Sequence, residues 1–218
     1  MAPAFTIFAT AIGYCAIAWN AVGLTGVWLP DAAAARLRAR IVRRRPDLAE
    51  ARPEGAIDQA VGAITALLRG ERTDLTAIPI DDTALDAFDA CVYSAARTIP
   101  PGRVITYAAL AERVGATATA REVGQSLGRN PFPIVVPCHR IVAAGGQLGG
   151  FSAPGGSATK RRLLTIEDAR LDGAGDLFDT ADCGAPPIAD QAAFGSASVG
   201  AKTPSSPTGA AIDPARRA

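Results

Sequence analysis

The first 35 residues of the chain contain no Lys or Arg, and residues 4–29 are mostly apolar. A secretion signal requires a basic start, which this segment lacks, and a membrane-spanning helix needs about 20 apolar residues in one continuous helix. Here the apolar run is interrupted, and it is rich in strand-forming residues. We therefore expect paired strands at Phe5–Phe8 and Tyr14–Trp19 around a turn, and a third strand near Val27–Leu29. The interrupting residues are Gly13, Asn20, Gly23 and Gly26.

Helical patterns follow this strand-rich segment. Asp31 is placed to cap a helix that continues to about Arg45. A second helix is predicted from Pro53-Glu54 to Gly70, and Leu75–Ile80 is expected to be a short strand. The first helix carries a run of arginines that is typical of a solvated face, with DNA contact as the alternative. These are Arg36, Arg38, Arg40, Arg43, Arg44 and Arg45.

A second unit is expected to begin near Asp81. Its pattern predicts an amphipathic helix over residues 85–96, a short extended pair at Val104-Ile105, and two helices at Tyr107–Val114 and Thr119–Leu127. Two short helices joined by a turn with Gly115 indicate either a helix-turn-helix or an ordinary helical hairpin. The remaining predictions are a buried strand at Pro133–Pro137, a glycine-rich loop over 143–156 and a helix at Thr159–Glu167.

Composition changes after residue 167. From Asp168 onward the chain consists mainly of Ala, Gly, Ser, Pro and Asp with few large apolar residues, which predicts a disordered tail. The domain prediction is therefore residues 1–80, residues 81–167 and a tail over 168–218.

Charge is distributed unevenly among these parts. The net charge of the chain is only +1, but residues 90–167 contain nine Lys or Arg against three Asp or Glu. The neighbouring segments are more acidic, and they hide this basic segment in the total. A locally basic segment fits a nucleic-acid partner better than the whole-chain charge does.

Cys138 and His139 are the residues best suited to take part in a chemical reaction. The four cysteines are widely spaced and match neither a disulfide nor a metal pattern, which indicates a reduced intracellular protein. His139 is the only histidine, so a histidine-rich metal site is excluded. A thiol reacts as its thiolate, and a neighbouring base can remove its proton. A lone Cys-His pair is nevertheless more often structural than catalytic.

The segments around Cys138 carry a longer pattern. Asn130-Pro131 lies upstream of Pro137-Cys138-His139-Arg140, and Gly149-Gly150-Phe151-Ser152 follows downstream. The pattern resembles the active-site signature of the O6-alkylguanine-DNA alkyltransferases, also called methylated-DNA–protein-cysteine methyltransferases. The resemblance is dense over residues 81–167 and loose over 5–80. Further matching positions include Ile99-Pro100, Gly102, Thr106-Tyr107, Leu110-Ala111, Arg121, Val123-Gly124, Lys160, Leu163-Leu164 and Glu167.

The resemblance implies an α/β (α+β) fold, with an N-terminal ribonuclease-H-like domain of sheet and helices and a mostly helical domain with a winged helix-turn-helix. It implies irreversible transfer of an alkyl group from O6-alkylguanine in double-stranded DNA to Cys138, once per molecule. His139 would take the thiol proton through a water, Glu167 would orient His139, and Asn130 would brace the turn. No cofactor or metal is implied, since the damaged base supplies the alkyl group.

Other residues would handle the DNA. A stacked guanine is out of reach of a thiolate, so the nucleotide must be flipped out. Arg121 would replace the flipped base, and Tyr107 would rotate the nucleotide and, with Ser152, donate to the departing guanine. The carbonyl oxygens of Cys138 and Ile141 would read its amine, and Leu127 would form an apolar wall. The substrate- and DNA-binding candidates are Tyr107, Arg121, Leu127, Arg140, Ile141 and Ser152.

Two positions depart from the family pattern. Phe151 stands where the family often has Tyr, which removes a hydroxyl and keeps the packing surface. Glu122 follows Arg121 where the family commonly has Ala, so an acid lies close to the expected path of DNA.

Two other functions stay open at this point: a cysteine hydrolase, and a non-enzymatic sensor of alkylated DNA. Sensors of this type lack the acceptor cysteine, so Cys138 argues against that class. The residues do not distinguish methyl from larger groups, or guanine O6 from thymine O4. We expect a cytoplasmic monomer without membrane contact.

Overall fold

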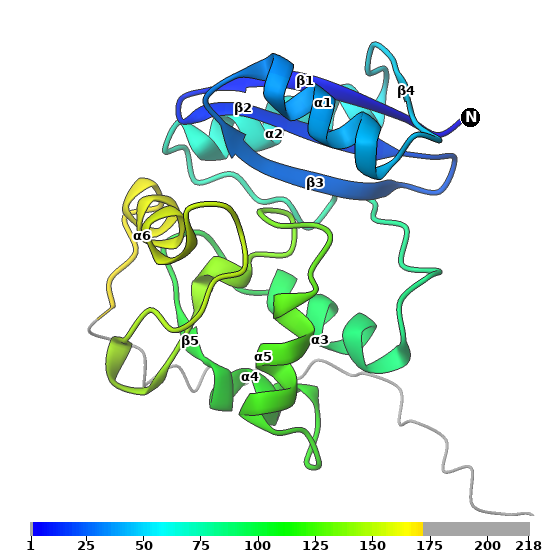
Figure 1. The fold of residues 1–218 in the computed structure, drawn as a ribbon. Coiled ribbons are helices and arrows are strands. Elements are labelled where there is room, and N and C mark those ends of the chain that lie inside the picture. The colour runs from blue at the N-terminus through cyan, green and yellow to red at the C-terminus, as the bar shows by residue number, and fades with distance from the viewer. Residues whose placement is uncertain (1, 172–218) are drawn as a thin grey trace, which may run out of the picture. The chain divides into compact units, whose positions relative to one another are not determined.

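The computed structural model describes residues 2–171, and its N-terminal half is built on a four-stranded sheet (Figure 1). β1 and β2 form an antiparallel hairpin, β3 extends it on one side, and β4 pairs in parallel with β1 on the other. The expected hairpin and third strand are confirmed. The strands are β1 (Ala4–Thr10), β2 (Gly13–Trp19), β3 (Leu24–Asp31) and β4 (Ala49–Glu50).

Two helices, α1 (Ala34–Arg44) and α2 (Ala56–Leu68), cover the two faces of this sheet. Successive side chains of a strand point to opposite faces. Accordingly, Ala16 and Ala18 of β2 pack in one hydrophobic cluster with Leu37 and Ile41 of α1. The alternate β2 residues Cys15, Ile17 and Trp19 belong to the larger cluster that includes α2.

The helix start expected at Asp31 is wrong by two residues. Asp31 ends β3, where it is paired with Tyr14, and the N-cap position of α1 is Ala33. A strand can continue past Pro30 because β3 lies at the sheet edge, where a missing N–H is tolerated. The Asp31 carboxylate still accepts from the Ala33 N–H, at 3.0 Å, so it supports the same turn from outside the helix.

The second half is mostly helical, as expected. α4 and α5 are joined by residues 115–119 and pack together beside α3, which gives the helix-turn-helix arrangement, and β5 pairs in parallel with β6. The α/β expectation with a helical second half is confirmed. The elements are α3 (Ala87–Arg97), β5 (Ile105–Thr106), α4 (Tyr107–Val114), α5 (Ala120–Gly128), the 3₁₀ helix η1 (Cys138–Arg140), β6 (Ile141–Val142), the 3₁₀ turn η2 (Ala144–Gly146) and α6 (Gly156–Ile166).

The strand expected at Leu75–Ile80 does not form. Three carbonyl groups of this segment bind a side chain instead of a neighbouring strand. One guanidinium nitrogen of Arg97, Nη2, donates to the carbonyl oxygens of Leu75, Thr76 and Ile78 at 3.2, 2.6 and 2.7 Å. Only an isolated bridge between Leu24 and Ile80 remains of the expected pairing.

The two halves share one hydrophobic cluster, which runs from the sheet through α2 to α3, α4 and α5. A boundary near residue 80 therefore stays a proposal about how the chain is organised. The expected tail falls largely on residues 172–218, which lie outside the described residues. Among the described residues, no helix has the length and apolar character needed to cross a membrane.

Arg97→Met should lower the free energy of unfolding by about 1–3 kcal/mol, because it leaves carbonyl groups at the edge of the core without their donor. Urea unfolding measures the loss. Arg97→Lys keeps one charged donor and should fall between the parent and Arg97→Met. Equal stability of all three proteins would contradict this account of the 75–80 segment.

Candidate active site

The chain reaches Cys138 through a tight turn, where the sequence predicted a strand at Pro133–Pro137. Asn130 organises this turn with its side-chain amide: Nδ2 donates to the Val136 carbonyl at 3.0 Å, and Oδ1 accepts from the Phe132 N–H at 2.8 Å. Ile134 has a φ of 79°, a left-handed conformation that is uncommon for a β-branched residue. The backbone is thus folded back on itself, and local side-chain bonding outweighs the strand preference of the Ile-Val-Val run.

Cys138 begins the 3₁₀ helix η1, and its side chain is largely buried, with 8% of the residue exposed. Burial raises the pKa of the Cys138 thiol, because the charged thiolate loses solvation. The Asn130 side chain, the positive charge of Lys160 and the N–H groups of Cys138 and His139 act in the opposite direction. The resting group is therefore a thiol whose surroundings already contain partners for the thiolate.

His139 lies beside it, with 1% of the residue exposed. Its Nε2 is 2.9 Å from Oε1 of Glu167, and its Nδ1 is buried without a hydrogen-bond partner among the described residues. Burial lowers the pKa of His139 despite the nearby Glu167 carboxylate, and the charges of Arg140 and Lys160 add to that effect. A neutral ring that donates from Nε2 has a free lone pair on Nδ1, which is the form a proton acceptor needs.

Glu167 is held by two side chains at once. Besides His139, it accepts from Arg140 Nε and Nη2 at 2.9 and 2.8 Å, and the Gly102 N–H lies 3.4 Å from its Oε2. Burial alone would raise its pKa, but the bonds to His139 and Arg140 outweigh burial and lower the pKa to about 2. The carboxylate therefore stays ionised in the interior.

Arg140 does not lie where a DNA- or substrate-binding residue would. It is buried, with 4% of the residue exposed, and it also donates from Nη1 to the Ile99 carbonyl at 2.5 Å. A guanidinium fork suits two carboxylate oxygens, and here the fork is occupied by Glu167. The expectation for Arg140 is corrected: it supports Glu167 from inside the protein.

Lys160 has a place in the site that the sequence did not reveal. Lys160 is fully buried, with 0% of the residue exposed. Its Nζ donates to the Ile141 carbonyl at 2.5 Å and lies 5.6 Å from the ring centre of Tyr107. Burial lowers its pKa to about 8. The usable signal was its spacing, since Lys160 shares one helical face with Leu163 and Leu164, both buried.

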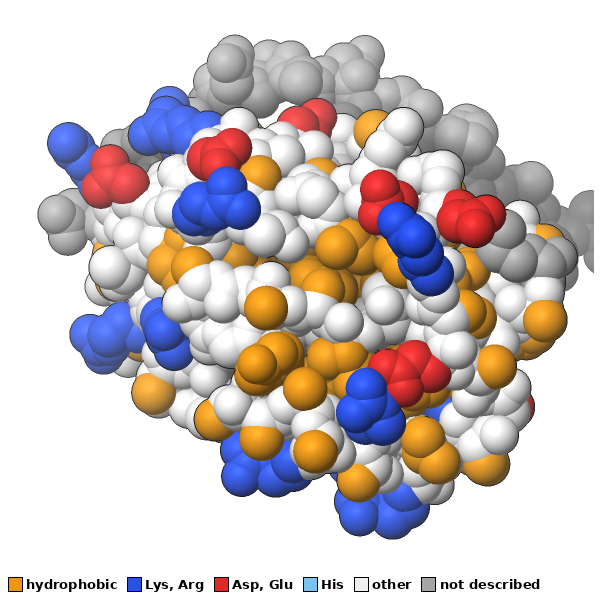
Figure 2. Space-filling view, turned by 90° about the horizontal axis from the view of Figure 1, so that it is seen from above, with side chains coloured by type: hydrophobic (Ala, Val, Ile, Leu, Met, Phe, Trp, Pro, Cys, Tyr) orange, Lys and Arg blue, Asp and Glu red, His pale blue; other side chains and the backbone are white. Residues whose placement is uncertain are grey.

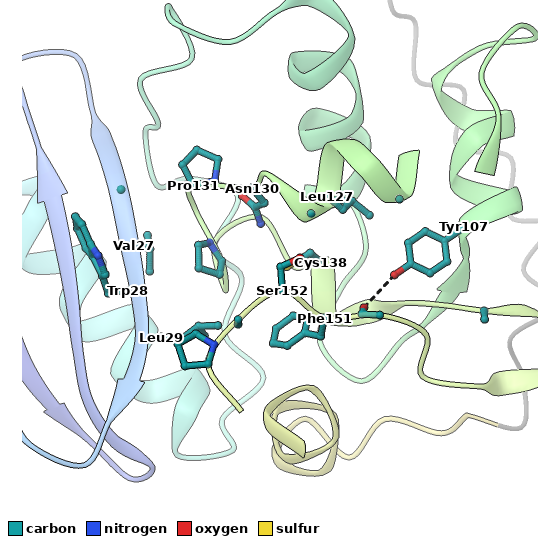
Figure 3. A pocket seen from close by; sticks show the side chains of 18 of the residues that line it. Val27, Trp28, Leu29, Tyr107, Leu127, Asn130, Pro131, Cys138, Phe151 and Ser152 are labelled. Atoms are coloured by element: carbon teal, nitrogen blue, oxygen red, sulfur yellow. Dashed lines mark hydrogen bonds between the residues drawn. The ribbon is translucent and has the colours of Figure 1, made fainter. Parts of the chain in front are cut away.

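A cavity of about 1270 Å³ gives access to Cys138, as Figure 3 shows from close by. Tyr107, Leu127 and Ser152 line it, and Tyr107 donates to the Gly150 carbonyl at 3.4 Å. Val27 of β3 lies on the opposite wall and its N–H donates to the Pro131 carbonyl at 2.8 Å. The sheet and the active-site turn thus share one hollow.

Arg121 also lines the cavity, from the first turn of α5. Thr119 caps this helix, and its side chain and that of Glu122 complete a capping box: the Glu122 carboxylate accepts from the Thr119 N–H at 2.9 Å. Arg121 is exposed, whereas Ile141 is fully buried and can offer only its carbonyl oxygen. Apart from Arg140, the site residues predicted from the sequence either line this cavity or support the residues that line it.

Comparison with protein families gives one match over the second half. Residues 87–169 match the family described as 6-O-methylguanine DNA methyltransferase, DNA binding domain. The matched segment holds α3 to α6, and with them Cys138, His139 and Glu167.

Individual proteins resemble a longer part of the chain. A methylated-DNA–protein-cysteine methyltransferase of Mycobacterium tuberculosis is 39% identical over 125 residues, which are 57% of this chain and 73% of the relative. A DNA base-flipping protein of Thermus thermophilus is 34% identical over 154 residues, 69% of this chain and 99% of the relative. A crystal structure of Mycobacterium tuberculosis OGT in complex with DNA has a TM-score of 0.61 at 30% identity, covering 77% of this chain and 96% of that one.

Removing the charge of Arg140 should raise the pKa of His139. In Arg140→Gln the Glu167 carboxylate would face His139 alone, which stabilises the protonated ring, whereas Arg140→Lys keeps a cation and should leave the His139 pKa close to the parent value. Because His139 is the only histidine, its NMR signals can be followed over pH without assignment. An unchanged His139 pKa in folded Arg140→Gln would contradict the charge sharing described here.

Proposed function

Because the chain belongs to the methylated-DNA–protein-cysteine methyltransferase family, we propose that it repairs double-stranded DNA by taking the alkyl group from guanine O6 onto Sγ of Cys138. The observation that carries this proposal is the position of Cys138, in a cavity and next to the buried pair of His139 and Glu167. A hydrolase would need a second group for its oxyanion and would turn over, and we assign neither property to this site.

The thiol of Cys138 is activated by transfer of its proton, first to a water and then to His139. No direct hydrogen bond joins Cys138 Sγ to the His139 ring among the described residues, so a water carries the thiol proton to Nδ1 of His139. Glu167, already ionised, stabilises the resulting imidazolium through Nε2. This is the order of nucleophile, base and orienting carboxylate seen in covalent catalysis. Asn130 and Lys160 stabilise the thiolate that remains.

The transfer itself is a substitution at the alkyl carbon. The bond from guanine O6 to that carbon breaks as the bond to sulfur forms, and the electron pair stays on the guanine. Tyr107 and Ser152 donate hydrogen bonds to the departing guanine anion. The anion then takes up one proton at N1, and His139 gives up through water the proton that came from Cys138, so the charges balance. The product is a thioether, which has no proton to lose and no route back to the thiol, so each molecule acts once.

Delivery of the base requires that it leave the duplex, since its O6 is enclosed by stacking and pairing. Arg121 enters the duplex in place of the flipped guanine, and Tyr107 helps to rotate the nucleotide. Leu127 packs on the base. The Ile141 carbonyl already accepts from Lys160 Nζ, but a carbonyl oxygen has two lone pairs, so it can also accept from the guanine amine, as can the Cys138 carbonyl.

The same proposal places the protein in the cytoplasm as a monomer. An acceptor thiol must stay reduced before its single use, which a reducing compartment ensures. One chain supplies every group of the reaction, so no second copy is needed.

Product formation should stop at one alkyl group per protein molecule. Incubation with increasing amounts of O6-methylguanine duplex, followed by measurement of repaired base, gives the stoichiometry. Cys138→Ser should bind the duplex and repair nothing within the same time, because a hydroxyl is far less acidic than a thiol. Repair beyond one equivalent would exclude the single-use reaction, and binding without any repair by the parent protein would favour a lesion sensor.

Arg121→Ala should slow repair of duplex DNA by at least about tenfold while leaving the reaction with free O6-benzylguanine within about twofold of the parent, because a free base requires no flipping. Rates on both substrates decide the point. The melting temperature of Arg121→Ala controls for damage to α5. Equal losses on the two substrates would place Arg121 in the chemistry or the fold rather than in base flipping.

A further inference from the structure

The cavity at Cys138 continues beyond the groups that the reaction uses. Pockets for small ligands typically measure about 300–1,000 Å³, and this one measures about 1270 Å³. Its additional wall comes from the N-terminal half, where Thr25 and Trp28 of β3 line it together with three arginines from α1 and its C-cap. These are Arg40, Arg44 and Arg45.

The arginines of α1 and its C-cap differ in how their charges are balanced. Arg36, Arg38 and Arg45 lie 2.6, 2.6 and 2.8 Å from Asp or Glu oxygens. Arg40 has only a longer contact of 3.7 Å, to Asp31, and Arg44 has no ion pair among the described residues. Figure 2 shows that, on the face of the molecule seen there, some Lys and Arg side chains lie beside acidic side chains and others do not.

Two polar atoms in the lining of this part of the cavity also lack partners. Nε of Arg40 and Oγ1 of Thr25 are buried and have no hydrogen-bond partner in the part of the chain that the structure describes. Buried polar atoms are satisfied in most proteins, and an exception calls for an explanation. A guanidinium N–H and a hydroxyl, next to the uncompensated charge of Arg44, are donors that suit an anion with several oxygens.

We propose that Arg40, Arg44 and Thr25 form a phosphate-binding subsite for the backbone of the DNA that delivers the damaged base. The inference rests on the proposed function, since it takes DNA as the occupant of the cavity. DNA is the occupant that fits because Arg121 lines the same cavity, so cationic side chains from α1 and from α5 border one hollow. Contacts to phosphate fix position and carry no sequence information. The subsite therefore adds affinity for DNA of any sequence. Its residues belong to the N-terminal half and not to the helix-turn-helix.

The chain offers a matched pair of variants to test this subsite. Arg43 and Arg44 are adjacent, exposed and in the last turn of α1, but only Arg44 lines the cavity. Arg44→Gln and Arg43→Gln remove the same charge from the full chain. Duplex affinity is measured for parent and variants at several salt concentrations, on duplexes with and without O6-methylguanine. Melting temperatures confirm that each variant is folded.

Arg44→Gln should weaken binding to both duplexes by about three- to tenfold at low salt and reduce the slope of log K against log salt by about one. Arg43→Gln should stay within about twofold of the parent in duplex affinity and should react with free O6-benzylguanine at the parent rate. Equal weakening by both variants would show a diffuse charge effect and overturn the subsite, as would parent-like binding of Arg44→Gln. Failure of the parent to transfer an alkyl group to Cys138 would instead contradict the proposed function, independently of these affinities.

Discussion

The buried carboxylate of Glu167 is the group on which the rest of the site depends. It is buried, with 5% of the residue exposed, and it is kept ionised by His139 and Arg140, since a charge without partners in the interior would take up a proton instead. Arg140 neutralises the carboxylate whether or not His139 is protonated. His139 can therefore rest as a neutral base and still find a counter-charge when it gains a proton. The series of groups from Arg140 through Glu167 and His139 thus connects buried charges to the reactive thiol of Cys138.

The fold supplies what this network needs from distant parts of the chain. α6 ends beside Glu167, η1 presents Cys138, His139 and Arg140, and the bond from Val27 to Pro131 fixes the sheet against the active-site turn. Lys160 adds a second buried cation between Ile141 and Tyr107. In the reaction proposed for Cys138, the N-terminal half thus forms one wall of the cavity, and the helix-turn-helix binds the DNA.

Elements whose signals are local could be predicted from the sequence. The hairpin follows from a strand-forming run interrupted at Gly13, and the end of α4 follows from Gly115. The predictions fail where a distant side chain satisfies the backbone: Arg97 takes the carbonyls of the 75–80 segment, and Asn130 folds the Pro133–Pro137 segment into a turn. Arg140 was misplaced for a related reason, because its partner Glu167 is 27 residues away. Motif resemblance gave the cysteine, the histidine and the acid, but not the buried positions of Arg140 and Lys160.

The central claim is that Cys138, among four cysteines, receives the alkyl group. The most direct measurement is peptide mapping by mass spectrometry, after the full chain has reacted with a duplex that carries one isotopically labelled O6-methylguanine. The account predicts label in the peptide that contains Cys138, and in no other, with the repaired guanine recovered unlabelled in the duplex. Label on Cys15, Cys91 or Cys183, or repair of the duplex with no labelled protein, would contradict it.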